Sequence, residues 1–72
     1  MEHHRGVGIE GLSKGELEVL IFLSKGCTDK EIARLRGTTR VTVGSQVRVL
    51  LIKLDAGRRI EAAVLAAKAG LV

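Results

Sequence analysis

The chain has 72 residues, a formal net charge of +4 and a single cysteine, so it forms one small domain with no internal disulfide. One aromatic residue and no Trp or Tyr argue against a surface that stacks unpaired bases. No apolar run approaches the ~20 residues of a membrane span, and the N-terminus lacks the apolar segment of a signal peptide. We therefore expect a cytoplasmic protein that does not enter a membrane.

The N-terminal residues 1–11 are predicted to be a flexible lead-in, and residues 12–72 to be the only domain. His3 and His4 could hold a metal as a pair, but a mobile tail is the favoured interpretation. The rest of the sequence has no metal-ligand spacing. No metal and no cofactor are predicted.

Apolar residues recur at helical spacing and Pro is absent, which predicts an all-α fold. Two capping boxes mark helix starts, one made by Ser13 with Glu16 and one by Thr28 with Glu31. Thr39 is the predicted N-cap of a third helix. The four predicted helices cover about residues 13–25, 28–36, 39–54 and 58–69.

The third predicted helix has one apolar face and, opposite it, a face of short and basic residues. Its buried face is predicted to consist of Val43, Val47, Leu50 and Leu54. Small residues on the opposite face would allow close approach to base edges, and a long donor such as Arg48 could reach them. A polar, solvated face is the plain alternative. The residues on this face are Arg40, Val41, Gly44, Ser45 and Arg48.

The fourth predicted helix is apolar nearly all round, which leaves one face for a partner. We expect Ile60, Val64 and Ala67 to pack on the first helix. The other face would then form a twofold homodimer interface, unless the helix is merely rich in a good helix former. This predicted interface consists of Ala62, Leu65, Ala66 and Ala69.

Charge is distributed unevenly along the chain. Residues 34–60 hold seven basic residues and one acidic residue, whereas residues 9–33 hold three basic and five acidic residues. Such an asymmetry is typical of a protein that presents one face to nucleic acid or to an anionic membrane. A basic surface that only keeps the protein soluble would give the same count.

An enzymatic function is not expected. The only histidines are in the tail, so no nucleophile, base and orienting group occur together. Cys27 is predicted to be an inert, half-buried thiol beside a helix start.

Six short motifs, in order and without a gap, resemble the LuxR/GerE-type helix-turn-helix domain over about residues 12–72. Such domains are four-helix transcription regulators that bind duplex DNA, usually as dimers through the fourth helix. Some are output domains of response regulators, preceded by a receiver or ligand-binding domain, and others stand alone. The motifs are Leu12-Ser13-x-x-Glu16-x-Glu18-Val19-Leu20, Gly26, Lys30-Glu31-Ile32-Ala33, Thr39-x-x-Thr42-Val43, Lys53-Leu54 and Arg59-x-Glu61-Ala62.

The resemblance implies which residues would touch DNA. Gly44, Ser45 and Arg48 would face the bases in the major groove. Contacts with the phosphate backbone of the DNA would come from Arg40, Thr42 and Gln46. Lys53 and Arg59 stand at positions that are typically basic in the family and would also contact phosphate.

The chain departs from the family pattern at four positions. Gly15, Gly44 and Gln46 stand where the family usually has Arg, Lys and His. Arg36 stands where a core leucine is expected, which predicts that the second helix rotates or ends early and that Leu35 fills the gap. These departures motivate an alternative: a degenerate helix-turn-helix that serves as a protein-interaction and dimerisation module. A domain like region four of a sigma factor is a third hypothesis, and the end of the chain fits it less well.

Overall fold

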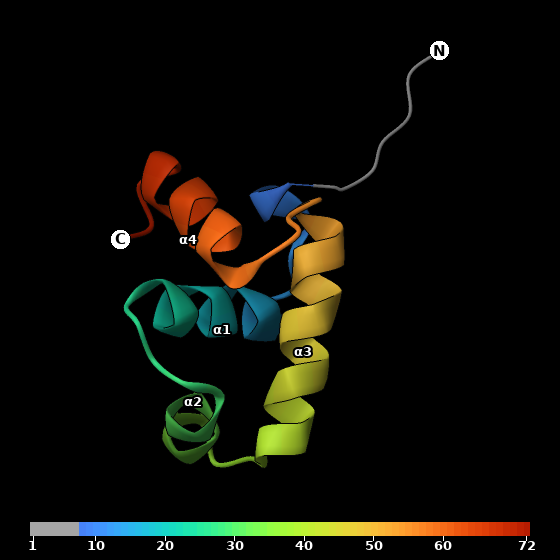
Figure 1. The fold of residues 1–72 in the computed structure, drawn as a ribbon, viewed down its shortest axis with the longest axis vertical. Helices are drawn as coiled ribbons and strands as arrows, with labels where there is room; N and C mark the ends of the chain where they lie inside the picture. The colour runs from blue at the N-terminus through green and yellow to red at the C-terminus, as the bar shows by residue number, and fades with distance from the viewer. Residues whose placement is uncertain (1–7) are drawn as a thin grey trace.

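The computed structural model describes residues 8–72, and His3 and His4 lie outside the described residues. The described chain begins with a short 3-10 helix, Ile9–Gly11, and continues with four α-helices. No strand occurs in this range, so the predicted all-α, four-helix class is confirmed (Figure 1). The helices are α1 (Lys14–Ser24), α2 (Asp29–Arg36), α3 (Arg40–Lys53) and α4 (Arg59–Lys68).

Local hydrogen bonds set the starts of the first three helices. Both predicted capping boxes are confirmed: the Glu16 amide donates to Ser13 Oγ over 3.1 Å, and the Glu31 amide donates to Thr28 Oγ1 over 3.1 Å. Each glutamate in turn accepts from the N-cap amide. Thr39 caps α3 in the same way, without the reciprocal carboxylate. These bonds satisfy amides that have no partner within the helix.

A three-residue turn joins α2 to α3. Gly37 ends α2 with φ 70° and ψ 36°, a left-handed conformation that costs glycine little. The turn places α2 and α3 as a compact pair, with α3 running past α1 as well (Figure 1).

The core lies where α1 meets the other three helices. Leu20, Ile32 and Leu50 are its largest fully buried side chains, and they come from α1, α2 and α3. α4 contributes two alanines and packs mainly on α1. The buried residues are Val19, Leu20, Leu23, Ile32, Ala33, Val43, Val47, Leu50, Leu54, Ala62 and Ala66.

The end of the predicted lead-in has regular structure. Residues 9–11 form the 3-10 helix, and Ile9 is half-buried against the core. The Gly8 amide donates to the Lys53 carbonyl over 3.3 Å, which ties this segment to the end of α3. An apolar side chain that packs and a backbone hydrogen bond hold residues 8–11 on the domain.

The predicted orientation of α4 is wrong. Ala62 and Ala66 are fully buried in the chain's own core, whereas Ile60 and Val64 have exposed fractions of 64% and 45%. Alanines let α4 lie close to α1, because a small side chain shortens the distance between two helix axes. Ala62 and Ala66 therefore cannot form a dimer interface.

The predicted role of Leu35 is also wrong. Leu35 is 59% exposed, and Arg36 is the residue that turns inward from the end of α2. The Arg36 side chain is only 20% exposed, and its guanidinium contacts Glu18 on α1 and Gln46 on α3. Helix α2 does not rotate to hide the charge, because paired groups accommodate it in place.

Candidate nucleic-acid interface

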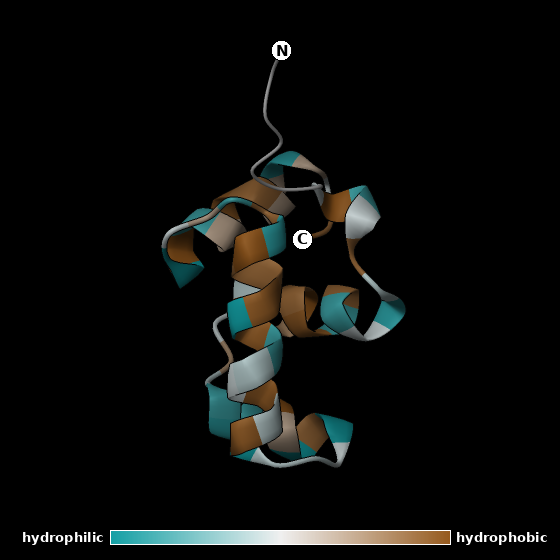
Figure 2. Ribbon diagram, turned by 90° about the vertical axis from the view of Figure 1, so that its right-hand side faces the viewer, coloured by the Kyte–Doolittle hydropathy of each residue, from teal (hydrophilic) through white to brown (hydrophobic). Residues whose placement is uncertain are grey.

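Helix α3 presents a stripe of outward-facing residues opposite its buried face. Val41 is 81% exposed, and Ser45 and Arg48 are exposed one and two turns further along. Ile52, 65% exposed, continues the stripe. Residues at this 4-3-4 spacing share one side of a helix. Figure 2 looks onto α3 and shows that apolar and polar residues are mixed along it.

The two exposed arginines of α3 have no ion-pair partner among residues 8–72. Both Arg40, at the start of the helix, and Arg48 are exposed, and the ion pairs of this part of the chain involve other cations. Thr42 is exposed as well, and its hydroxyl accepts a 3.0 Å hydrogen bond from Thr39 Oγ1. An unpaired arginine keeps its full set of donors for an external anion.

Gly44 lies on the flank of α3 rather than on the outward stripe. It is half-buried, and a Cβ placed on it would lie 3.9 Å from Oδ2 of Asp29, at the start of α2. Because glycine has no side chain, nothing protrudes from the helix beside the stripe at this position. A side chain at this position would pass beside the carboxylate of Asp29.

Gln46 lies on the other flank, where its amide contacts Arg36. The Gln46 Oε1 atom accepts a 3.2 Å hydrogen bond from Arg36 Nη1. A guanidinium can only donate, so the oxygen of the amide must face Arg36. The NH₂ group of Gln46 therefore keeps its donors for another partner.

Lys53 and Arg59, which the resemblance assigns to DNA phosphates, both form ion pairs within the chain. Lys53 Nζ lies 2.8 Å from Glu16 Oε1, and Arg59 pairs with Asp29. Arg59 also donates to the Cys27 carbonyl over 3.2 Å. Both cations tie distant parts of the chain together: Lys53 joins α3 to α1, and Arg59 joins α4 to the start of α2.

One carboxylate oxygen of Glu16 serves two purposes. Oε1 accepts from the Ser13 amide in the capping box and from Lys53, each over 2.8 Å. The hydrogen bond with Lys53, followed by that from the Ser13 backbone, lowers the pKa of Glu16 below its ordinary value. Glu16 therefore stays ionised in the folded protein as the pH falls below that value.

Sequence reasoning missed Ile52 on the outward stripe and the partner of Arg59. Ile52 could have been found, because it continues the 4-3-4 spacing of Val41, Ser45 and Arg48. Lys30 and Arg34 are further exposed cations, both on α2. No sequence pattern marks Asp29 as the partner of Arg59, since the two residues lie 30 positions apart.

The predicted dimer residues divide into two groups. Leu65, 37% exposed, and Ala69 remain accessible on α4, unlike the two buried alanines. The exposed apolar side chains of this helix are Ile60, Val64 and Leu65, in its first two turns.

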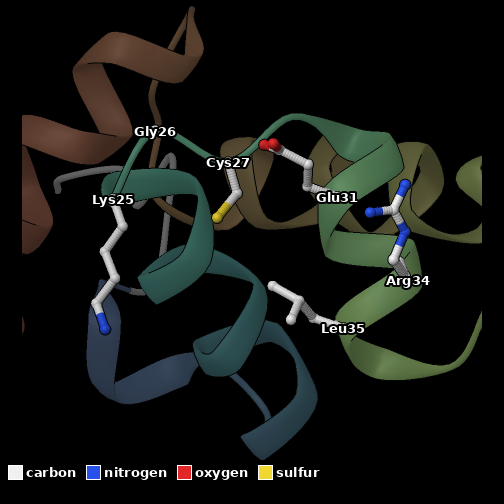
Figure 3. Close-up of a pocket in the computed structure, with 6 residues that line it drawn as sticks. All are labelled: Lys25, Gly26, Cys27, Glu31, Arg34 and Leu35. Carbon is white, nitrogen blue, oxygen red and sulfur yellow. The ribbon is translucent and has the colours of Figure 1, made fainter.

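A shallow depression lies between the end of α1 and the outer side of α2. Figure 3 shows Cys27 Sγ and the Leu35 side chain pointing toward one another across it. The depression has a volume of about 450 Å³ and is open to solvent. Its lining holds a thiol without a neighbouring histidine, and residues 8–72 contain no group of three metal-ligating side chains. Within the same residues, no helix is long and apolar enough to cross a membrane.

Comparison with known proteins agrees with this geometry. Residues 10–66 match the family model GerE, described as bacterial regulatory proteins, luxR family. The chain is 41% identical over 63 residues to the transcriptional regulatory protein LiaR of Bacillus subtilis (strain 168), a match that covers 88% of this chain and 30% of LiaR. The chain thus spans less than a third of the length of this relative. No solved structure matches the chain. The family match and the four-helix fold together establish that the chain belongs to the luxR family of bacterial regulatory proteins.

Proposed function

We propose that the chain binds duplex DNA as the DNA-binding domain of a transcription regulator, with α3 in the major groove. The observation that carries this proposal is the outward stripe of Val41, Ser45 and Arg48, directly opposite the buried face of α3. A helix can enter the major groove when one face holds it to the domain and the other presents short side chains and one long donor. The name of the relative LiaR, a transcriptional regulatory protein, supports the same function.

Phosphate contacts would supply most of the affinity. Arg40, Thr42 and the free NH₂ group of Gln46 border the outward stripe, and each can donate to a phosphate oxygen. Lys30 and Arg34 add exposed positive charge on α2.

We also propose that this domain is part of a longer protein and acts in the cytoplasm. Since LiaR is more than three times as long as the matched segment, a receiver or ligand-binding domain in a longer parent protein is consistent with the comparison. A protein that binds bacterial DNA acts in the cytoplasm.

We propose that the chain dimerises through α4, but through a different face of this helix from the one predicted from the sequence. Ile60, Val64 and Leu65 are exposed apolar residues of this helix, and a twofold contact would bury them. Two copies of α3 would then contact half-sites about 10 base pairs apart. Light scattering should give twice the chain mass for the wild type and the monomer mass for Val64→Glu. A wild-type monomer at every concentration would refute this interface.

The test of DNA binding is a selection of bound sequences from a random duplex pool, followed by titration at about 50 mM and 200 mM salt. We expect an enriched motif and an affinity that falls steeply with salt. The variant Arg48→Ala should relax the motif at one position, and the matched control Arg58→Ala, an exposed arginine outside α3, should leave the motif unchanged. No binding to any duplex at low salt would refute the function.

A protein-interaction module is the second candidate. The exposed Val49 and Ile52 on α3 favour it, because a protein partner could bury these apolar side chains. A stable dimer that binds no duplex at low salt is the outcome that would support it.

A further inference from the structure

Val41 has an unusual environment for an apolar residue. At 81% exposed, it is the most exposed large apolar side chain of residues 8–72. It lies in the first turn of α3, directly after Arg40, and its neighbours one and two turns on are Ser45 and Arg48. No helix of the domain covers it, so its side chain is available to a partner of α3.

The first turn of a groove-binding helix is the part that reaches base edges. Of the groups that bases present in the major groove, only the C5-methyl group of thymine is apolar. A branched aliphatic side chain has no hydrogen-bonding atom, so a methyl group is the one feature of a base pair that Val41 can recognise.

We infer that Val41 is a specificity-determining residue that recognises a thymine through its methyl group. This inference rests on the proposed DNA binding, and it adds the base class that the start of α3 selects. Neither Gly44, which has no side chain, nor Ser45, whose hydroxyl bonds to any base, can make this selection.

The spacing along α3 also predicts where this thymine lies in the site. Val41 and Arg48 are seven residues apart, which is roughly 10 Å along a helix axis. That length equals about three base-pair steps. Since arginine pairs best with guanine, the selected motif should hold a thymine about three base pairs from the guanine that Arg48 contacts.

The test replaces thymines of the selected site one at a time by deoxyuridine, which keeps every hydrogen bond and lacks only the methyl group. We expect one position per half-site at which the wild type loses roughly fourfold in affinity, the effect of one buried methyl group. The variant Val41→Ser should show no loss at that position. The matched control Val72→Ser changes an exposed valine outside α3 and should behave as the wild type.

Two results would overturn the inference. One is a wild-type affinity that is the same for every deoxyuridine probe. The other is a loss in Val41→Ser equal to that of the wild type, which would assign the methyl contact to another side chain. Either result leaves DNA binding intact, whereas a protein that binds no duplex refutes the proposed function itself.

Discussion

A Cβ atom placed on Gly15 would lie 3.2 Å from Nη2 of Arg36, so a glycine in α1 makes room for an arginine at the end of α2. These are two of the positions at which the chain departs from its family pattern. The contact indicates that the departures compensate one another. Without a side chain at residue 15, the guanidinium can turn inward and reach Glu18 over 3.3 Å and Gln46 over 3.2 Å.

Gly15→Ala is therefore expected to change stability only when Arg36 is absent. In the wild type, the gain in helix propensity is offset by the tight contact, and the free energy of unfolding should change by less than about 0.5 kcal/mol. In an Arg36→Met background, the same change should stabilise by about 0.5–1 kcal/mol. Urea unfolding of the four proteins measures this coupling. Arg34→Met, an exposed arginine on the same helix, is the control. An equal effect of Gly15→Ala in all backgrounds would show that the two residues are independent.

The salt dependence of DNA binding should separate the arginines of α3 from the internally paired cations. Arg40→Met and Arg48→Met should each lower the slope of log affinity against log salt, by about 0.9 for each phosphate that is no longer neutralised. Lys53→Met and Arg59→Met should leave the slope unchanged, because Glu16 and Asp29 already neutralise these groups.

The last two variants should instead cost up to about 1 kcal/mol in the free energy of unfolding, since both ion pairs are partly exposed. Circular dichroism would check that the helices remain. If Lys53→Met lowered the slope of log affinity against log salt, Lys53 would contact a DNA phosphate.

Neighbouring alanines of α4 should respond in opposite ways to enlargement. Ala66→Leu adds volume to a fully buried position and should destabilise the protein by about 1–3 kcal/mol. Ala67→Leu adds the same volume to an exposed position and should change stability by less than about 0.5 kcal/mol. Thermal unfolding of the two variants at low protein concentration decides the matter. If Ala67→Leu were the more destabilising change, Ala67 would be the buried residue and Ala66 the exposed one, as the sequence alone predicted.

Stability should decrease in acid partly through Glu16. Its pKa is lowered in the folded protein, so its contribution is fully present above the ordinary value of 4.5 and is lost as the pH falls through the folded pKa. Glu16→Gln should therefore flatten the loss of unfolding free energy below pH 4.5. Lys53→Met should flatten it in part, because the lysine is the main cause of the shift. If both variants keep the acid dependence of the wild type, other carboxylates control it.

The sequence by itself determined the starts of the first three α-helices, the turn between α2 and α3, and the buried face of α3. Each of these depends on residues a few positions apart. A capping box spans three residues, as with Ser13 and Glu16, and a buried face repeats every three or four residues, as with Val43 and Val47. Local hydrogen bonds and helical spacing act within one element, so the printed order of residues is sufficient.

Only the tertiary structure decided which side of α4 is buried, which residue at the end of α2 turns inward, and which cations remain unpaired. α4 is apolar on nearly every side, so its sequence contains no preferred face, and packing against α1 selects Ala62 and Ala66. Lys53 meets Glu16 across 37 positions of sequence, and no periodic pattern encodes such a contact. The rotation of a helix about its axis and the pairing of distant charges depend on how the helices pack together, and that packing exists only in the folded chain.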